Sequence, residues 1–452
     1  PAGVLQVWPA NETTKVGHIP NSPTIWSAST GGPWYERRAE IKSFEVRGTG
    51  NTVGVVGGGA PRCMFLNCLN MTTAYFADDP ANNRGTFSTT TATDTARMFE
   101  GCVNLVDMTG EGAFDFSSVT YMVQMFYNCY KLTSLDSTNW DVSKVTSMGY
   151  LFRNCEKLAE LDVSKWDTSS CTDMNHVFCG VLSLETLDVS GWNTSKVVTM
   201  YGLFSGMRAL KSLDVTNFDT SKVRSFSWTF YQLTSITYLD VSNLDTSSVA
   251  YMKSTFSNSN KLTGLDLSGW NTSNLQSAPA MFAGCTALTS VNLQGWNTTK
   301  VASREALGDD YVADSWGEVC GELSSMFQGC TSLVTLDLSS FDTSRVTNMA
   351  QMFSGCTSLQ TIYVSDKWTV SNMISGTSTV SFNSNNGTSV ASRTGKIGTA
   401  VGALPTNPTR SGYVFAGWYE TSTDANNVSN GSVPGSGSVG KKITNLGRFP
   451  VG

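Results

Sequence analysis

One repeat restricts what this chain can fold into. The segment LDVSKWDTSS at residues 161–170 returns as LDVSGWNTSK at 187 and as LDVTNFDTSK at 213, each 26 residues after the last. A second marker has the form F-x-x-C-x-x-L. The cysteine position is mostly apolar in the other copies, and the leucine position holds an aliphatic residue or methionine. The marker occurs eleven times, and its 26-residue spacing is kept from Phe126 to Phe282. A period of roughly 20 to 50 residues is typical of solenoids, in which each repeat forms one coil.

Each repeat contains a short strand and a tight return. The segment L-x-x-L-D-V alternates apolar and polar residues, as a half-buried strand does. The segment V-x-x-M-x-x-M-F has apolar residues three apart, which favours a short helical or 3₁₀-like return. One unit cannot bury its own apolar stripe, whereas stacked coils can, with strands about 4.8 Å apart. We therefore predict a parallel-stranded, leucine-rich-repeat-like β solenoid, roughly 50 Å long for about ten coils.

The repeats divide the chain into three regions. Residues 1–60 precede the regular repeats and are expected to form an N-terminal cap region, residues 61–376 the solenoid, and residues 377–452 a separate small β module. One repeat is longer than the others, because 45 residues separate Phe282 from Phe327, which is 45 − 26 = 19 more than the period. We place this insertion near residues 303–321 and expect the flanking coils to close without it.

The repeat unit MFxxCxxLxxLDVSxWDTSKVTxM resembles the 26-residue leucine-rich repeats of BspA-like bacterial surface proteins, over about residues 61–373. The segments TVSFNSNNGTSV from 379 and NPTRSGYVFAGWYE from 407 are similar to the Listeria–Bacteroides repeat, the B-repeat of internalins. That resemblance implies a β-grasp-like module, although the LYAKW sequence that usually closes it is absent, which leaves its completeness open. Both resemblances imply exported proteins of bacterial surfaces, often adhesins.

Composition excludes several classes of function. With 30 Lys and Arg against 36 Asp and Glu, the net charge is −6, which excludes a strongly basic nucleic-acid surface and a polybasic membrane patch. No apolar run approaches the roughly 20 residues that span a membrane. The two histidines, His18 and His176, lie in unrelated regions, so the sequence nominates no catalytic triad. We predict that the protein is not an enzyme.

The cysteines are predicted to be buried, reduced thiols. Seven of the eleven occupy the position three residues after the repeat phenylalanine, where other coils have valine, methionine, leucine or serine. Side chains of neighbouring rungs run parallel, which does not suit a disulfide. The segment CTDMNHVFC at 171–179 has the ligand types of a zinc site, but the repeat register directs Cys171 inward and His176 outward. We therefore predict no metal site there. The seven cysteines are Cys68, Cys102, Cys129, Cys155, Cys285, Cys330 and Cys356.

Two repeated columns allow a structural and a functional interpretation. The aspartate of L-D-V either accepts hydrogen bonds from the turn that follows or forms a ladder for Ca²⁺ or a basic ligand. Asn292 replaces it once, which favours the turn. The tryptophan column, in which Trp166 and Trp192 are neighbours, is either core packing or a carbohydrate platform. No cofactor is predicted, with Ca²⁺ at the aspartate ladder or at the acidic insertion as the alternative.

The candidate binding residues are those that differ between coils. Aromatic side chains at variable positions, expected to be outward, suit contact with a protein or a glycan, or are simply tolerated there. The insertion combines acidic and aromatic residues and is either a binding loop or a neutral excursion. The candidates are Tyr127, Tyr130, Tyr150, Tyr201, Trp228 and Tyr231 in the coils, and Asp309, Asp310, Tyr311, Asp314 and Trp316 in the insertion.

These observations predict a non-catalytic bacterial cell-surface binding protein, an adhesin, whose solenoid wall binds a host or neighbouring-cell protein. The alternatives are a glycan-binding module and a structural stalk. We expect an extracellular location at the bacterial surface or cell wall, with no nucleic-acid partner and no direct insertion into a membrane. The chain starts without a signal peptide and ends without an anchor, so we expect a mature segment of a larger exported protein.

Overall fold

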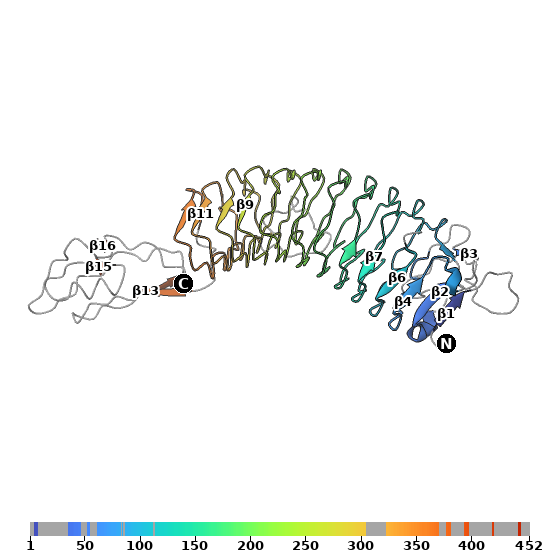
Figure 1. The fold of residues 1–452 in the computed structure, drawn as a ribbon. Helices are drawn as coiled ribbons and strands as arrows, with labels where there is room; N and C mark the ends of the chain where they lie inside the picture. Colours follow the sequence, from blue (N-terminus) through green and yellow to red (C-terminus); the bar gives the residue numbers. More distant parts are fainter. Residues whose placement is uncertain are drawn as a thin grey trace, which may run out of the picture.

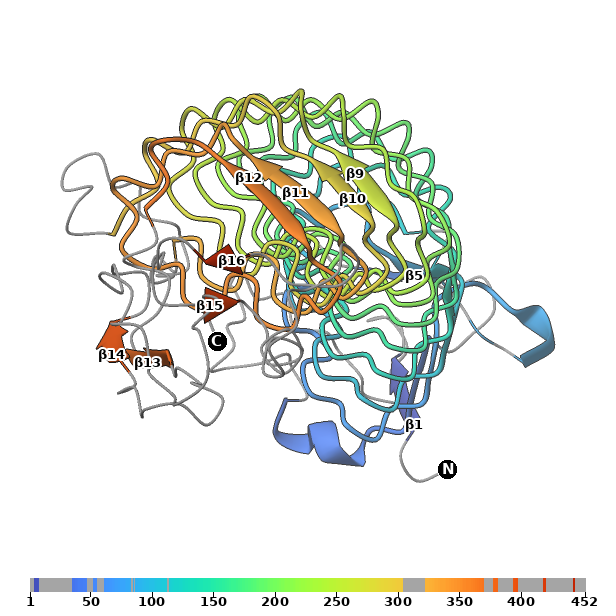
Figure 2. The same ribbon diagram turned by 90° about the vertical axis from the view of Figure 1, so that its left-hand side faces the viewer.

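The computed structural model forms a curved solenoid whose coils lie one behind the other (Figure 1), and the view turned by 90° shows them superposed as rings (Figure 2). The predicted solenoid is confirmed. The structure describes residues 35–46, 61–82, 86–111, 114–303 and 322–369, together with residue 84 and six short strands at 4–7, 52–54, 377–380, 393–396, 418–419 and 442–443.

Parallel strands form one line along the solenoid. A four-stranded sheet has the order β1-β2-β4-β6, and the L-D-V segments continue it as parallel pairs, β7 with β8, β9 with β10 and β11 with β12. Strands β1 and β2, from the predicted cap region, thus extend the same ladder. The bounds are β1 (Val4–Val7), β2 (Ser43–Val46), β4 (Thr73–Tyr75), β6 (Asp107–Thr109), β7 (Ser134–Leu135), β8 (Glu160–Leu161), β9 (Gly264–Asp266), β10 (Ser290–Asn292), β11 (Thr335–Leu338) and β12 (Thr361–Val364).

The remaining elements are short. Two 3₁₀ helices are η1 (Tyr35–Glu40) and η2 (Pro80–Asn82), and a parallel pair joins β3 (Thr52–Gly54) to β5 (Thr86–Ser88). Beyond the repeats, β13 (Thr377–Val380) pairs antiparallel with β14 (Arg393–Lys396), and β15 (Trp418–Tyr419) with β16 (Lys442–Ile443). The rest of the predicted C-terminal module lies outside the described residues.

The tight return of each coil is a series of turns. The N–H of Arg153 donates to the carbonyl of Tyr150 within the coil (3.2 Å), whereas the N–H of Asn154 donates to Cys179 in the next coil (2.8 Å). The i→i−3 bonds of a 3₁₀-like return are therefore present, but they alternate with bonds to the neighbouring coil. This alternation requires left-handed backbone at two positions per coil, with φ of +62° at Tyr150 and +63° at Asn154.

Two columns of stacked rings fill the core. Phe178 lies 5.9 Å from Phe152 and 6.0 Å from Phe204 between ring centroids, and both pairs are stacked. Trp166 stacks on Trp192 at 6.2 Å, and its indole N–H donates to the carbonyl of a residue in the preceding coil (3.2 Å). Because these tryptophans are buried, the packing interpretation of their column is confirmed and the carbohydrate platform is wrong.

The cysteine column makes hydrogen bonds between neighbouring coils, and the aspartate column makes them within each coil. The thiol of Cys155 is buried and donates to the carbonyl of Phe126 in the preceding coil (3.2 Å), and Ser259 makes the same contact with Phe230 (2.9 Å). The ten cysteines in the described part of the chain are free. Asp162 accepts hydrogen bonds from the N–H (3.0 Å) and hydroxyl (2.6 Å) of Ser164, which lower the pKa of its carboxyl group. The aspartate column therefore shapes turns.

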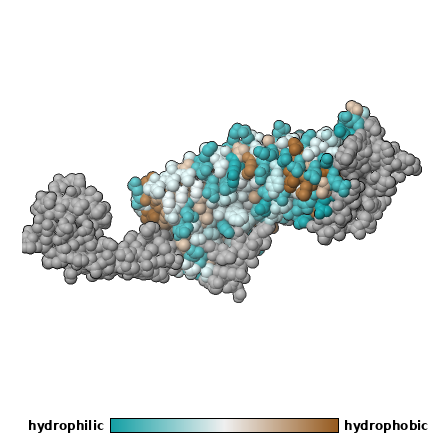
Figure 3. All heavy atoms as spheres, turned by 90° about the horizontal axis from the view of Figure 1, so that it is seen from below, coloured by the Kyte–Doolittle hydropathy of each residue, from teal (hydrophilic) through white to brown (hydrophobic). Residues whose placement is uncertain are grey.

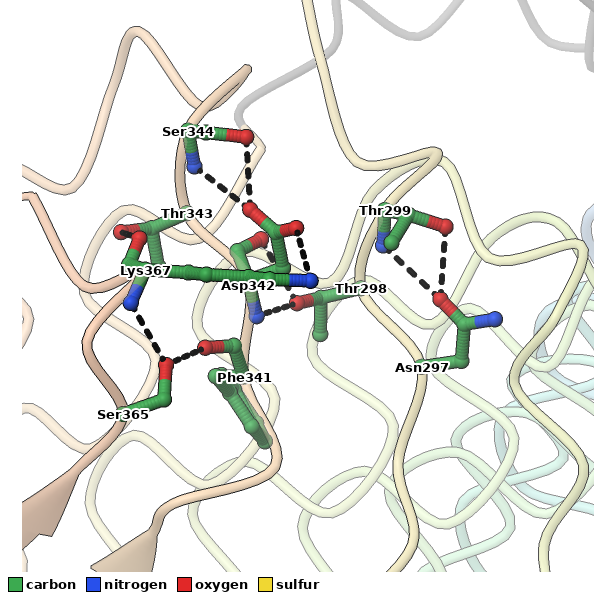
Figure 4. A network of polar contacts seen from close by, with 9 residues as sticks. All are labelled: Asn297, Thr298, Thr299, Phe341, Asp342, Thr343, Ser344, Ser365 and Lys367. Atoms are coloured by element: carbon green, nitrogen blue, oxygen red, sulfur yellow. Dashed lines mark hydrogen bonds and ion pairs between the residues drawn. The ribbon is translucent and has the colours of Figure 1, made fainter.

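The coils close across the insertion as predicted. Phe282 stacks on Phe327 at 5.2 Å, although 45 residues separate them in the sequence. Thr298 donates its hydroxyl to the carbonyl of Asp342, and the N–H of Asp342 donates back to that hydroxyl oxygen, both at 2.8 Å (Figure 4). The insertion candidates Asp309, Asp310, Tyr311, Asp314 and Trp316 lie outside the described residues.

Candidate ligand-binding groove

Six rings from five successive coils contact one another in a continuous row. We name Tyr127, Tyr150, His176, Tyr201, Trp228 and Tyr231 the aromatic row. The centroid distances in this order are 6.3, 4.8, 5.0, 5.3 and 6.4 Å. All six side chains come from the tight returns. The structure thus brings together five of the six aromatic residues predicted in the coils.

Burial in the row differs from the prediction. Tyr201 was expected to face outward, but it is only 3% exposed because rings from both neighbouring coils cover it. His176, also expected outward, is 4% exposed and stacks on Tyr150. Tyr127, Tyr150, Trp228 and Tyr231 are half-buried. Tyr130 is half-buried too, but it is not one of the rings of the row.

Left-handed backbone aligns the row along the solenoid. Tyr150, His176 and Trp228 occupy the same position in their coils, with φ between +55° and +62°. That conformation costs a non-glycine residue about 1–2 kcal/mol, which ring stacking offsets. Gly202 occupies this position in the intervening coil, where a Cβ atom would lie 2.9 Å from the His176 ring. Tyr201, one residue earlier, supplies the ring there.

An open groove of about 670 Å³ adjoins the row and runs across seven coils. Arg153, His176, Trp228 and Tyr231 contribute to one part of its lining, and small or polar side chains make up much of the rest. None of the described lining residues is aspartate or glutamate. The lining consists of Arg153, His176, Cys179, Ser205, Trp228, Tyr231, Ser254, Ser257, Asn258, Ala283, Gly284, Gln328 and Gly329.

Cations lie against the rings of the row. The Arg153 guanidinium carbon is 5.8 Å from the Tyr127 centroid and 5.2 Å from that of Tyr150, and the Lys253 ammonium is 5.3 Å from that of Trp228. The Nε of Arg153 is buried and has no hydrogen-bond partner within the described part of the chain. The carboxylate of Asp173 accepts hydrogen bonds from the Ser147 hydroxyl (2.8 Å) and the N–H of Asn175 (3.0 Å).

His176 is held in its neutral form. Burial, with a smaller contribution from the positive charge of Arg153, lowers the pKa of its imidazole to about 3. At neutral pH the groove therefore carries its positive charge on Arg153 and not on His176. A signal for His176 was present in the sequence, because its repeat position holds a ring in two other coils, Tyr150 and Trp228.

We expect His176 to make the protein less stable in mild acid. Because its folded pKa lies below the ordinary value of about 6.5, the unfolded chain binds more protons between pH 6.5 and 3, and stability falls as pH falls through that window. Between pH 6.5 and 5 the loss is roughly 2 kcal/mol. Urea unfolding at both pH values measures it.

The matched variant is His176→Phe, which keeps a ring in the row and removes the titrating group. Its free energy of unfolding should change by roughly 2 kcal/mol less over the same pH interval than that of the wild type. The remaining histidine, His18, is common to both proteins and cancels in the comparison. Equal pH dependence in the two proteins would show that His176 titrates normally in the fold.

The described residues lack both a metal site and a membrane-spanning helix. No group of three or more histidine, cysteine, aspartate and glutamate side chains there could hold a metal ion. In the same part of the chain no helix has the length and apolar character needed to cross a membrane. On the face seen in Figure 3, the described surface is mostly hydrophilic, with small separate apolar areas.

The fold is a leucine-rich-repeat-like solenoid that carries the aromatic row and an open groove. Its repeats match the family DUF285, described as Mycoplasma protein of unknown function, over residues 69–162, 157–238, 202–310 and 317–391. These stretches cover more than half of the sequence, and the chain belongs to this family. Residues 379–438 match the Listeria–Bacteroides repeat domain. Both predicted resemblances are confirmed.

The solved structures to which this chain is similar include three bacterial proteins. A leucine-rich cell surface protein from Faecalibacterium prausnitzii is 16% identical, with 72% of this chain and 79% of that chain covered and a TM-score of 0.31. An internalin from Listeria monocytogenes is 16% identical, with 60% and 78% covered and a TM-score of 0.17. A leucine-rich-repeat protein from Leptospira interrogans is 10% identical, with 67% and 84% covered and a TM-score of 0.19. A comparison with curated proteins gave no significant match.

Proposed function

We propose that this protein is a non-catalytic adhesin of a bacterial cell surface, and that the groove beside the aromatic row binds a protein displayed by a host or a neighbouring cell. The observation that supports this most directly is the groove itself, an open space of about 670 Å³ flanked by Trp228, Tyr231 and the guanidinium of Arg153. Aromatic and arginine side chains are the residues that most often dominate binding energy. The location is extracellular, at the cell surface or cell wall.

The proposal includes no catalytic step. General acid–base chemistry needs a titrating group near the working pH, and the histidine of the groove lining has a pKa of about 3. The described lining contributes no carboxylate that could act as its partner. Binding, by contrast, needs only rings, a cation and hydrogen-bonding side chains, all of which line this groove.

Binding of the full chain to intact host and bacterial cells, and to purified extracellular-matrix and mucin proteins, tests this function. We expect Trp228→Ala to weaken binding at least tenfold, because it removes a half-buried ring from the groove lining. Tyr238→Ala is the matched control, since Tyr238 is 71% exposed and does not line the groove. Equal loss in both variants, or none in either, would contradict the proposal.

The insertion at residues 303–321 is proposed as a second contact, through Asp309, Asp310, Tyr311, Asp314 and Trp316. Its deletion should leave thermal unfolding nearly unchanged, because Phe282 and Phe327 already stack on either side of it. The same binding assay then shows whether the insertion contributes. If the deletion leaves the binding affinity unchanged, binding belongs to the groove alone. If the deletion weakens binding only when Ca²⁺ is present, the insertion binds this ion.

A further inference from the structure

We propose that the occupant of the groove is an acidic oligosaccharide lying along the solenoid axis, with an anionic group on Arg153 and sugar faces against Trp228 and Tyr231. This inference rests on the proposed function and deepens it, because it makes the bound surface protein a glycoprotein. Three features of the groove carry it: backbone N–H groups that are already hydrogen-bonded, uncharged polar side chains, and an arginine in a described lining that contains no carboxylate.

Backbone N–H groups along the groove already donate hydrogen bonds within the solenoid. Each return donates alternate N–H groups to carbonyls of the next coil: Gly180 to Ser205 (2.8 Å), Gly206 to Tyr231 (2.7 Å), Gln232 to Ser257 (2.9 Å), Asn258 to Ala283 (2.7 Å) and Gly284 to Gln328 (2.7 Å). An extended peptide that pairs with a sheet edge needs free N–H groups, and the N–H groups of these five residues are already bonded. Side chains therefore supply the hydrogen-bond donors at these positions.

Those side chains suit sugar hydroxyls. Serine hydroxyls and the amides of Asn258 and Gln328 both donate and accept hydrogen bonds, as the hydroxyls of a sugar do. Ala283, Gly284 and Gly329 also line the groove, and their small side chains fill little of its space. Trp228 and Tyr231 line the groove, and the faces of aromatic rings carry partial negative charge that attracts the polarised C–H groups of a sugar.

The charge of the groove selects an acidic ligand. Arg153 is part of the groove lining, and the described lining contains no carboxylate. A carboxylate or sulfate would receive charge-assisted hydrogen bonds from this guanidinium. The chain as a whole carries a net charge of −6, which disfavours densely charged polyanions such as nucleic acid. A sugar chain with isolated acidic groups fits both facts.

The length of the groove suits a chain rather than a single sugar. It extends from the coil of Arg153 to the coil of Gln328, which is six coil-to-coil steps of about 4.8 Å, or about 29 Å. Hydroxyl or amide side chains recur in most of these coils. The acidic group would lie at the Arg153 end, with the sugars that follow directed toward Gln328.

The test measures affinities of the full chain by calorimetry for carboxylated and sulfated oligosaccharides, for neutral oligosaccharides of the same backbone and for an acidic peptide. We expect an acidic oligosaccharide to bind at least tenfold more tightly than its neutral counterpart. Arg153→Gln should remove that difference, because the acidic sugar loses its cation, whereas Trp228→Ala should weaken the binding of both sugars. Arg208→Gln is the matched control, because Arg208 is exposed, donates to Gln232 (2.8 Å) and does not line the groove.

Protection of Cys179 from alkylation tests whether the ligand lies in the groove. This residue is partly exposed in the groove lining, and burial raises the pKa of its thiol, so alkylation is followed at alkaline pH by mass spectrometry of the peptide that contains it. The bound oligosaccharide should slow alkylation at Cys179 and not at Cys356, which lies outside the lining. Protection of neither cysteine would place any bound sugar elsewhere and overturn the inference.

The outcomes separate this inference from the proposed function. If the chain binds a surface protein through Trp228 and enzymatic removal of the glycans leaves affinity unchanged, the function stands and the oligosaccharide is wrong. If the acidic peptide binds more tightly than every oligosaccharide, the proposed function again stands and the oligosaccharide is again wrong. Equal effects of Arg153→Gln on acidic and neutral sugars would overturn the acidic part. Absence of binding to cells, proteins and sugars would overturn both proposals.

Discussion

Removal of residues 1–60 is expected to leave the rest of the chain largely insoluble. Phe44 in β2 is fully buried, and its ring lies 4.9 Å from Phe65, 5.3 Å from Phe76 and 5.8 Å from Phe87. Truncation would uncover these three rings at the end of the stack, at a cost of about 1.5–3 kcal/mol for each exposed side chain. Terminal repeats of solenoids need a cover for the same reason.

The soluble fraction after expression and the elution volume in size-exclusion chromatography measure this effect. Deletion of residues 303–321 is the control, because it also shortens the chain but leaves both neighbouring coils covered by each other. A truncated protein that stays soluble and monomeric, with an unchanged melting temperature, would show that residues 1–60 do not cap the solenoid.

Much of the core could be predicted because a strict period translates directly into columns. Once Phe152, Phe178 and Phe204 are 26 residues apart, stacking the coils places their rings one above another. The same register identified the buried cysteine position and the aspartate that shapes each turn. The structure adds why serine can replace cysteine at Ser259, because both side chains donate to the equivalent carbonyl of the preceding coil.

The sequence predicted five of the six rings of the aromatic row, but not His176 and not the way the rings are arranged. The sequence does not show the sign of φ, and left-handed backbone is uncommon for residues such as Tyr150, His176 and Trp228. That conformation turns the rings along the solenoid, so that each covers the next. Burial of Tyr201 depends on neighbours about 25 residues away on both sides, and a pattern within one repeat cannot reveal this.

The groove follows from a change of side-chain size along one repeat position. The position that holds Tyr127, Arg153 and Tyr231 holds Ser205, Ser257 and Ala283 in other coils. Large side chains in some coils and small ones in others leave a hollow, because the backbone spacing between coils stays constant. The sequence contained this signal, but it becomes readable only once the position is known to line the surface and not the core.

The largest effect of a single substitution is expected at Phe178→Ala, in the middle of the phenylalanine column. The ring is fully buried and lies 5.9 Å from Phe152, 6.0 Å from Phe204 and 5.9 Å from Trp192. Its removal leaves a cavity and costs about 3–5 kcal/mol in the free energy of unfolding. Because a solenoid is stabilised by contacts between neighbouring coils, the loss weakens the interfaces on both sides.

Urea unfolding followed by tryptophan fluorescence tests this prediction against two reference variants. Phe178→Leu fills most of the space and should lose less than half as much stability, and Tyr238→Ala should lose less than about 0.5 kcal/mol, because that side chain is largely exposed. Phe178→Ala should also split unfolding into two transitions, because it weakens the interfaces on both sides of one coil while the other interfaces stay intact. One unshifted transition for Phe178→Ala would mean that the ring column does not hold the coils together.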